Sequence, residues 1–303
     1  MSRAISNELA SSVSWRDYME LTKPRVVMLL MLTAIVGMFM STPGMVPLDV
    51  LILGSLGMAF AMGAAAAVNH VVDQRIDSIM ARTENRPIAK GKISSQRAIV
   101  FAAGLSVASM FILSFFINPL TAFLTLFGIV GYAFIYTMYL KRATPQNIVI
   151  GGLAGAIPPL LGWTAVTNNV DPHALLLVLI VFVWTPPHFW ALAIHRRDDY
   201  AKAGIPMLPV THGIEYTKSA VLYYTILMAL CTLLPYLTGM SGLIYLATTI
   251  VLNAIFIYYA IRLKFAPTQG IAMKTFGYSI IYLMCLFIVL LVDHYFMITL
   301  VNP

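Results

Sequence analysis

Residues 48–69 read LDVLILGSLGMAFAMGAAAAVN, a run of 22 residues in which Asp49 is the only charged side chain. About 20 predominantly apolar residues are enough for a helix to cross the hydrocarbon core of a bilayer. The whole chain has the same character: of its 303 residues, 60% are apolar and 10% are charged, and the mean hydropathy is +0.85. A soluble domain carries about 25% charged residues, and a disordered chain combines low hydrophobicity with high net charge. The sequence therefore predicts an integral membrane protein and excludes both other classes.

Apolar runs of similar length recur along the chain between turn-forming sequences such as Thr42-Pro43-Gly44. Long apolar runs separated by such breakers are typical of membrane-spanning helices. We expect an all-α integral membrane protein with nine transmembrane helices in one bundle, forming a single domain over residues 1-303. The predicted spans are 26-44, 48-69, 97-117, 120-140, 146-166, 174-194, 218-238, 241-262 and 276-299.

The distribution of charge predicts the orientation. All 19 Lys and Arg residues fall on one side of the membrane, and the opposite turns carry only Asp49, Asp171 and Asp293. Loops rich in Lys and Arg stay in the cytoplasm, so segment 1-24 is expected there and the C-terminus on the opposite side. Segment 1-24 lacks the apolar run of a cleavable signal peptide. We expect a multi-pass protein of the cell inner membrane, with the lipid bilayer as its partner and no nucleic acid, because the net charge of +7 is explained by orientation.

Two long charged segments, residues 70-96 and 195-217, lie on the predicted cytoplasmic side. Four predicted helices separate them, so both segments emerge at the same end of the bundle. The turns at the other end are short. We expect these two active-site loops to meet over a central cavity that opens to the cytoplasmic side.

In the first loop, Asn69, Asp73 and Asp77 follow one another at i, i+4 spacing, which places them on one face of a helix. Two carboxylates one turn apart repel each other, and a bound cation would offset that repulsion. An all-oxygen set suits Mg²⁺ rather than Zn²⁺. The alternative is a solvated helix end capped by Arg75 and Arg82, and the spacing alone does not decide between the two.

The second loop contains another acidic pair, Asp198 and Asp199, directly after Arg196 and Arg197. Mg²⁺ is usually held by one or two carboxylates together with the phosphate oxygens of a substrate, so two acidic clusters facing one cavity indicate a metal-bridged diphosphate. Nearby bases would neutralise the remaining oxygens, although the positive-inside rule alone would place most of them here. These bases are Arg75, Arg82, Arg86, Lys90, Lys141, Arg142, Arg196, Arg197 and Lys202.

A site of this kind, reached from lipid and ending in a phosphate pocket, fits an isoprenoid diphosphate, which has an apolar tail and a charged head. Ionisation of an allylic diphosphate makes a carbocation, which aromatic faces can stabilise. The same aromatic side chains also fit simple packing or interface roles. The candidates are Tyr132, Phe134, Tyr136, Tyr139, Trp163, Trp184, Phe189 and Trp190.

The pattern N-x-x-x-D-x-x-x-D after the second helix, with a later acidic loop ending in Gly and Leu-Pro, resembles the UbiA superfamily of intramembrane prenyltransferases. Within that superfamily, several long stretches are similar to the branch that farnesylates heme, and the resemblance covers nearly the whole chain. These stretches are KPRV (Lys23 to Val26), NHVVDQRIDSIMARTENRP, YTMYLKRATPQNIVIGGLAGAIPPLLGW, WTPPHFWALAI and DDYAKAGIPMLPV.

The resemblance implies a reaction in which the farnesyl group of farnesyl diphosphate is joined to a vinyl group of heme B and water supplies a hydroxyl group. The products would be heme O and diphosphate, heme B would be a substrate rather than a cofactor, and Mg²⁺ would be the cofactor. The implied partners also include a downstream heme-modifying enzyme or a terminal oxidase. Carried over from the superfamily, Asn69, Asp73 and Asp77 form the first metal-diphosphate motif, Lys141 and Arg142 form a basic pair, and Tyr136 matches the Tyr before that pair.

The second motif departs from the superfamily pattern. Many relatives have D-x-x-x-D there, whereas this chain has Arg196 and Tyr200 at those places and keeps only Asp198 and Asp199. We expect Asp198 and Asp199 to join Asp73 and Asp77 in binding metal. The departure implies either that this second metal site is weaker or that Arg196 and Arg197 bind oxygens that a second metal would otherwise hold. Cations here would also suit the two propionates of heme.

The remaining expectations concern the diphosphate and the heme. Arg82 and Arg86 are predicted to bind the diphosphate together with Arg196 and Arg197. His188, next to two prolines that would open the helix, is the first choice for an axial contact to heme. The other histidines near this side are His70, His195 and His212.

Two rival functions remain. The first is prenylation of an aromatic ring or quinone precursor by the same chemistry. The second is a transporter with the same helices. Helix breakers at Gly151-Gly152, Pro158-Pro159 and Pro186-Pro187 would suit either the gate of a transporter or a bulky planar substrate, so they do not decide between the functions. Transporters usually place ionisable residues near the bilayer midplane, whereas every charge here maps to the end of a span, so transport is disfavoured.

Overall fold

A computed structural model describes residues 13–266 and 270–298. The described part is entirely helical apart from its connecting turns, as the sequence predicts. The elements are α2 (Trp15–Leu21), α3 (Pro24–Met40), η1 (Val50–Gly54), α4 (Ser55–Val72), α5 (Gln74–Asp77), α6 (Ser95–Ile112), η2 (Leu113–Ile117), α7 (Pro119–Val130), η3 (Gly131–Leu140), α8 (Lys141–Ala143), α9 (Asn147–Ala156), α10 (Pro158–Thr167), α11 (Pro172–His195), α12 (Arg197–Lys202), α13 (Leu208–Thr211), α14 (Ile214–Cys231), α15 (Leu234–Leu237), α16 (Leu243–Phe265) and α17 (Ile271–Tyr295). The η elements are π-helical turns continuous with their α-helical neighbours.

The described residues form eight helical stretches that are long and apolar enough to cross a membrane. A ninth is formed if α2 and α3, which meet at a bend of 53°, are counted as one span. The nine predicted spans therefore correspond to observed helices, and the fold class is confirmed. Predicted segment 1-24 lies partly outside the described residues, and the last predicted span, 276-299, ends one residue beyond them.

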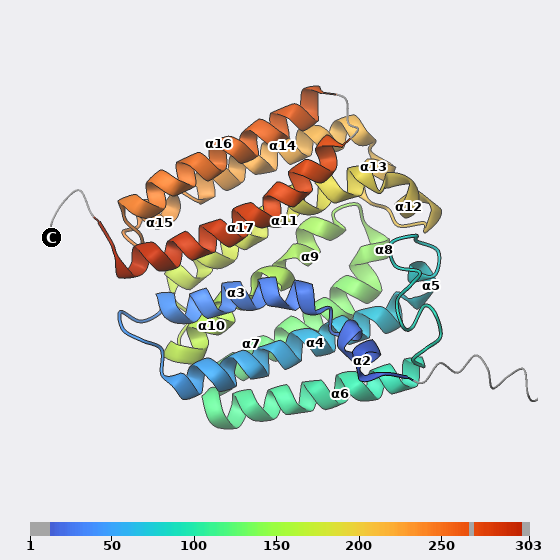
Figure 1. The fold of residues 1–303 in the computed structure, drawn as a ribbon, viewed down its shortest axis with the longest axis horizontal. Helices are drawn as coiled ribbons and strands as arrows, with labels where there is room; N and C mark the ends of the chain where they lie inside the picture. Colours follow the sequence, from blue (N-terminus) through green and yellow to red (C-terminus); the bar gives the residue numbers. More distant parts are fainter. Residues whose placement is uncertain (1–12, 267–269, 299–303) are drawn as a thin grey trace, which may run out of the picture.

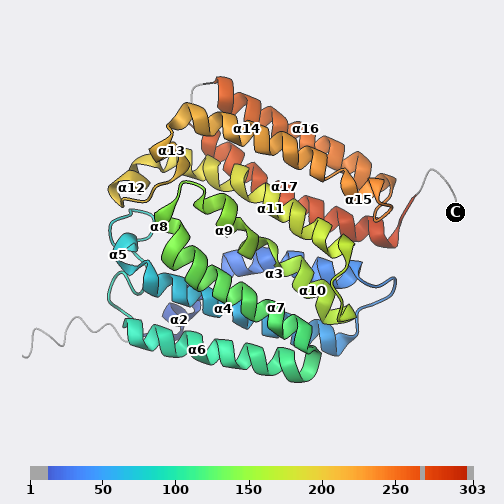
Figure 2. The same ribbon diagram turned by 180° about the vertical axis from the view of Figure 1, so that it is seen from behind.

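The long helices run side by side, with α11, α14, α16 and α17 on one side of the bundle and α3, α4, α6 and α7 on the other (Figures 1 and 2). Helices α9 and α10 lie between these groups (Figure 1). They form one predicted span that is divided in two at Pro158-Pro159, as the sequence predicts. The breaker at Pro186-Pro187 does not act as predicted. Helix α11 runs through both prolines without interruption, so the missing N–H groups leave two carbonyls in the preceding turn without their helical donors.

Close packing in lipid depends on small residues, because apolar side chains gain little by leaving an apolar solvent. Helices α3 and α10 cross at two glycines. A Cβ atom added to Gly162 would lie 1.8 Å from the carbonyl oxygen of Ala34, and one added to Gly37 would lie 2.2 Å from that of Pro159. The two backbones are therefore in direct contact, which fixes how α3 lies against the centre of the bundle.

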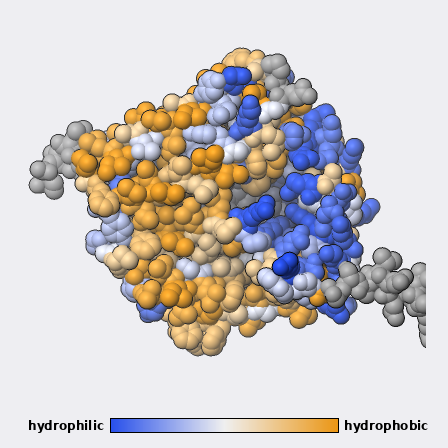
Figure 3. Space-filling view, in the orientation of Figure 1, coloured by the Kyte–Doolittle hydropathy of each residue, from blue (hydrophilic) through white to orange (hydrophobic). Residues whose placement is uncertain are grey.

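Polar residues gather at one end of the molecule, around α5, α8, α12 and α13, while the rest of this face is largely apolar (Figure 3). Both predicted loops lie at this end, and each is partly helical. The first contains α5, and the second contains α12 and α13. Asp293, predicted in a turn at the opposite end, is fully buried and accepts a hydrogen bond from the backbone N–H of Tyr245 (3.0 Å), where it caps α16. The carboxylate satisfies N–H groups at the N-terminus of α16, which have no acceptor within the helix.

Candidate active site

Three side chains at the end of α4 point into the protein. Asn69, Asp73 and Asp77 are exposed by only 4%, 1% and 3%. Helix α4 ends at Val72, and Asp73 links it to the short helix α5, so the i, i+4 stripe continues across the junction. The alternative of a solvated helix end is wrong, because a solvated carboxylate would not be buried to this extent.

Each buried carboxylate has a cationic partner. The Nζ of Lys141 donates to Oδ2 of Asp73 at 2.5 Å, and a guanidinium nitrogen of Arg86 donates to Oδ2 of Asp77 at 2.7 Å. The other oxygen of Asp73, Oδ1, is buried without a hydrogen-bond partner among the described residues. A buried carboxylate oxygen without a donor is costly, so it marks a position where a ligand or ion would bind.

Asn69 has a different role from the one expected of an oxygen ligand. Its amide oxygen accepts a hydrogen bond from Nζ of Lys23, and its amide nitrogen donates to Oδ2 of Asp73 at 2.8 Å and to Thr137 at 3.4 Å. The side chain therefore connects α3, α4 and η3 around Asp73. Lys23 and Thr137 were missed in the sequence. Lys23 lies in the quoted KPRV stretch, but no spacing rule joins it to residue 69.

Lys23 stands at the bend between α2 and α3 and adopts a left-handed conformation with a φ of 51°. Only two non-glycine residues in the described part have a positive φ, and such a conformation costs about 1 kcal/mol or more. The turn is followed by Pro24, whose fixed φ starts α3. This local strain places the Lys23 amine against Asn69.

The two polar loops meet, as the topology predicts. One buried apolar cluster contains Ile76 and Met80 from the first loop and Tyr200, Ile205 and Met207 from the second. Burial raises the pKa of the Tyr200 phenol, and the guanidinium groups of Arg82 and Arg196 oppose that shift. Arg82 of the first loop therefore lies close to Tyr200 of the second loop.

The second acidic pair is less enclosed than the first. The side chain of Asp198 is 84% exposed and lies 3.4 Å from a guanidinium nitrogen of Arg197, and Asp199 lies 3.4 Å from one of Arg196. Within residues 13–266 and 270–298, no three His, Cys, Asp or Glu side chains converge as a preformed metal site. A role for Asp198 and Asp199 in metal binding stays a prediction, which would need substrate oxygens to complete the ligand set.

The predicted basic pair and tyrosine lie beside the first cluster. Lys141 begins α8 and contacts Asp73 as described, while Arg142 donates to the backbone oxygen of Val72 at 3.3 Å. The ring of Tyr136 packs directly on α9. A Cβ atom added to Gly151 would lie 2.0 Å from that ring. The absence of a side chain at Gly151 therefore leaves the space that the ring of Tyr136 occupies.

The other predicted aromatic residues separate into two groups. Trp163 and Trp184 are buried in the central apolar cluster and Trp190 in the cluster below the loops, whereas Tyr139 and Phe189 are 69% and 38% exposed. Tyr132 stacks near Tyr136, with 5.5 Å between ring centroids. Tyr139 points outward and so does not line the buried site.

Among the predicted histidines, His188 is buried and enclosed by aromatic rings. It stacks between Trp184 and Phe276, with ring centroids 4.2 and 4.5 Å away, and its Nδ1 lies 2.7 Å from Oγ of Ser279. His70, next to Asn69, is also buried, and neither of its ring nitrogens has a hydrogen-bond partner among the described residues. His195 and His212 are exposed. Ser279 was missed because it lies 91 residues from His188 in sequence.

A hollow of about 430 Å³ lies next to this site, lined by residues on the exposed side of the α4–α5 junction. Val71, Val72, Gln74 and Arg75 contribute to it, whereas Asn69, Asp73 and Asp77 face the interior. It is therefore not the predicted central cavity, which stays a prediction.

The fold and the site together define a multi-pass membrane protein that concentrates buried carboxylates and cations at one polar end. The chain belongs to the UbiA prenyltransferase family, which matches residues 30–296. It is similar over nearly its whole length to proteins named protoheme IX farnesyltransferase. The relative from Alcanivorax borkumensis is 64% identical over 97% of this chain and 98% of its own, and protoheme IX farnesyltransferase 2 of Pseudoalteromonas atlantica is 65% identical over 94% and 93%.

Solved structures agree with the fold. Digeranylgeranylglyceryl phosphate synthase superimposes with a TM-score of 0.77 at 21% identity, over 93% of this chain and 99% of that chain. A UbiA homologue from Archaeoglobus fulgidus, bound to GPP and Mg²⁺, superimposes with a TM-score of 0.63 at 18% identity, over 91% and 99%. At these identities the likeness concerns the arrangement of helices.

Proposed function

We propose that this chain transfers the farnesyl group of farnesyl diphosphate to a vinyl group of heme B, with addition of water, and so makes heme O and diphosphate. The observation that carries the proposal is the identity of 64% over nearly the full length with a protein named protoheme IX farnesyltransferase. The buried carboxylate of Asp73 and the ammonium group of Lys141 are the kinds of group that such a reaction needs to bind a metal ion and a diphosphate.

The donor set fits Mg²⁺, which prefers oxygen ligands and keeps several waters. Asp73 offers a buried oxygen without a donor, and Asp77 lies one turn further along the same face. We assign the metal to Asp73 and Asp77, with Asp198 and Asp199 on the facing loop. When bound, Mg²⁺ would neutralise charge on the departing diphosphate. The GPP and Mg²⁺ of the Archaeoglobus fulgidus homologue support this assignment.

The cations of the site would hold the diphosphate. Lys141 and Arg86 are already oriented by Asp73 and Asp77, so they present charge without a further loss of side-chain freedom. Arg82, Arg196 and Arg197 on the two loops and Arg142 in α8 would add further cations. Asn69 would keep Asp73 and Lys23 in register, and Tyr136 would place an aromatic face beside the forming allylic cation.

His188 is our candidate for the axial contact to heme iron. The hydroxyl of Ser279 donates its proton to the backbone oxygen of Phe276 (2.6 Å), so its oxygen accepts a hydrogen bond from Nδ1–H of His188. That tautomer leaves the lone pair of Nε2 available, and a metal-bound histidine is usually oriented in this way by its second nitrogen. No partner of Nε2 is found in the described part of the chain.

The protein would lie in the cell inner membrane with its polar end in the cytoplasm, the N-terminus on that side and the C-terminus opposite. This follows from the positive-inside rule, since the two loops that are rich in Lys and Arg lie at the polar end of the molecule (Figure 3). Heme O would then be released to a downstream heme-modifying enzyme or a terminal oxidase.

The test is to incubate the detergent-purified protein with Mg²⁺, farnesyl diphosphate and heme B and to follow the porphyrin by mass spectrometry. A gain of a hydroxyethylfarnesyl group that disappears with EDTA is expected. Unmodified heme, together with prenylation of a hydroxybenzoate-type acceptor, would instead show that the acceptor is an aromatic ring.

The heme contact is tested separately by spectroscopic titration of heme B. His188→Ala should weaken heme binding and change the Soret band, while His212→Ala, at an exposed position on the same side, should change neither. Unaltered heme affinity and spectrum in His188→Ala would refute the axial assignment.

A further inference from the structure

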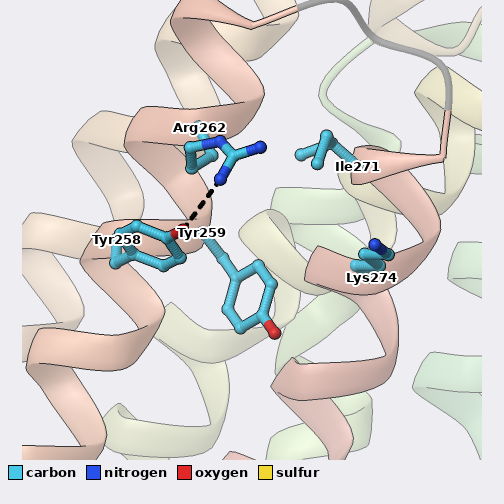
Figure 4. A pocket seen from close by; sticks show the side chains of 5 residues that line it. All are labelled: Tyr258, Tyr259, Arg262, Ile271 and Lys274. Atoms are coloured by element: carbon cyan, nitrogen blue, oxygen red, sulfur yellow. Dashed lines mark hydrogen bonds between the residues drawn. The ribbon is translucent and has the colours of Figure 1, made fainter.

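A second polar pocket lies between α16 and α17, and none of the candidate active-site residues lines it. Its volume is about 140 Å³, and it is lined by Tyr258, Tyr259 and Arg262 of α16 and by Ile271 and Lys274 of α17. Figure 4 shows the two cations on opposite sides of the gap, with the guanidinium group of Arg262 directed toward α17. One water molecule takes about 30 Å³ in the liquid, so the pocket can admit a group of five heavy atoms such as phosphate.

The pocket carries positive charge that is not neutralised. Arg262 donates to the phenol oxygen of Tyr258 at 2.8 Å, and its guanidinium carbon lies 5.7 Å from the centre of that ring. This contact fixes the side chain while leaving further N–H donors for a ligand. Glu215, an acid at the same end, is engaged by Lys218 at 2.8 Å and by Lys264 at 3.8 Å. Within the described residues, neither Arg262 nor Lys274 has a carboxylate partner.

The start of α17 adds to this charge. The helix begins at Ile271 after Gly270, which has a φ of 80° and offers no side chain as a cap. The first N–H groups of a helix have no acceptor within it, and the N-terminus carries a partial positive charge. Lys274 lies in the first turn of the same helix. An anion in the pocket would therefore meet two side-chain cations and a helix N-terminus.

The position of the pocket along the membrane-spanning helices indicates which kind of anion it would bind. Arg262 lies three residues before the end of α16 and Lys274 three residues after the start of α17, so at about 1.5 Å per residue both are within about 5 Å of the helix ends. Both helices are membrane-spanning. Ile261 and Phe265, which lie within three residues of Arg262 on α16, are 43% and 77% exposed, and such apolar surface suits acyl chains rather than water.

We propose that this pocket binds the phosphate of an anionic phospholipid headgroup from the leaflet at the polar end of the protein. Inorganic phosphate carries the same charge, but it has no apolar part that could contact the side chains of Ile261, Phe265 and Ile271. Basic pockets between membrane helices recognise lipid headgroups by this combination of charge and apolar surface. The site is independent of the proposed enzymatic function.

The experiment compares lipid retention by native mass spectrometry after exchange into detergent with equal amounts of phosphatidylglycerol and phosphatidylcholine. We expect preferential retention of phosphatidylglycerol. Loss of one cation should weaken it about fivefold and the double variant Arg262→Gln/Lys274→Gln about thirtyfold, since a basic residue near an anionic surface is worth about 1 kcal/mol. Arg97→Gln, an exposed base in the first turn of α6, is the matched control and should retain the lipid.

The charge-conserving variant Arg262→Lys/Lys274→Arg should keep most of the preference, which separates lost charge from misfolding. Equal retention of phosphatidylglycerol by the double Gln variant and the wild type would overturn the proposal. So would stabilisation of the wild type by inorganic phosphate to the same extent as by the lipid, because the ligand would then be a soluble anion.

Discussion

The pair Asp73–Lys141 allows stability and activity to be separated. The carboxylate is almost fully buried, and the side chain of Lys141 is 17% exposed, so replacing Asp73 by Asn leaves a mostly desolvated ammonium group without its counter-charge. Breaking a buried ion pair on one side costs about 3 kcal/mol or more, whereas replacing both partners is often close to neutral. A chain of 303 residues gains roughly 0.6 kcal/mol/K of unfolding entropy, so 3 kcal/mol corresponds to a fall in Tm of about 5 °C.

The assay is a double-mutant cycle on the detergent-purified protein, with thermal unfolding followed by size-exclusion chromatography and farnesyl transfer by mass spectrometry. Asp73→Asn and Lys141→Met should each lower Tm by about 5 °C, while the double variant returns close to the wild type and remains inactive. Equal destabilisation in the single and double variants would show that the two residues are not an energetic unit. Transfer activity in the double variant would refute the role of the Asp73 carboxylate.

Further variants probe the packing that positions the site. Gly162→Ala should lower the free energy of unfolding by at least the roughly 1–3 kcal/mol typical of overpacking, and with it Tm, because its Cβ would overlap the Ala34 carbonyl; a thermal shift checks this, and an unchanged Tm would contradict the backbone contact. Gly151→Ala should displace the ring of Tyr136 and lower kcat with little loss of protein yield, whereas Gly155→Ala, which has open space around its Cβ position, should behave as the wild type. EDTA should remove turnover in all active variants and weaken farnesyl diphosphate binding in calorimetry, and metal-independent binding would argue against the Asp73 assignment.

Much of the fold follows from the sequence because each spanning helix satisfies its backbone internally and must be long and apolar. This rule does not predict the position of a residue that is set by contacts between helices. Asp293 looks like a turn residue in sequence and is instead the buried cap of another helix, and Pro186 lies within a continuous helix.

The candidate site was predictable where its residues share one element. The shared face of Asn69, Asp73 and Asp77 follows from helical spacing that continues across the α4–α5 junction, and their burial excludes the solvated helix end, while their role in binding a metal stays a prediction. Contacts between distant segments were not predictable. Lys23 to Asn69 and His188 to Ser279 join residues 46 and 91 positions apart, and no local periodicity relates them.

The bend at Lys23 links the surface of the membrane to the centre of the chemistry. Helix α2 carries an exposed Trp15 at its start. Two residues after its end, the amine of Lys23 donates a hydrogen bond to the side-chain amide of Asn69, which in turn donates to Asp73. We therefore expect a force on α2, from lateral pressure in the lipid or from a protein fused ahead of it, to reach Asp73 through the contact of Lys23 with Asn69. The choice of lipid and of anything fused ahead of α2 should therefore affect the geometry at Asp73, whereas α17 ends at the opposite end of the bundle from α2 (Figure 1).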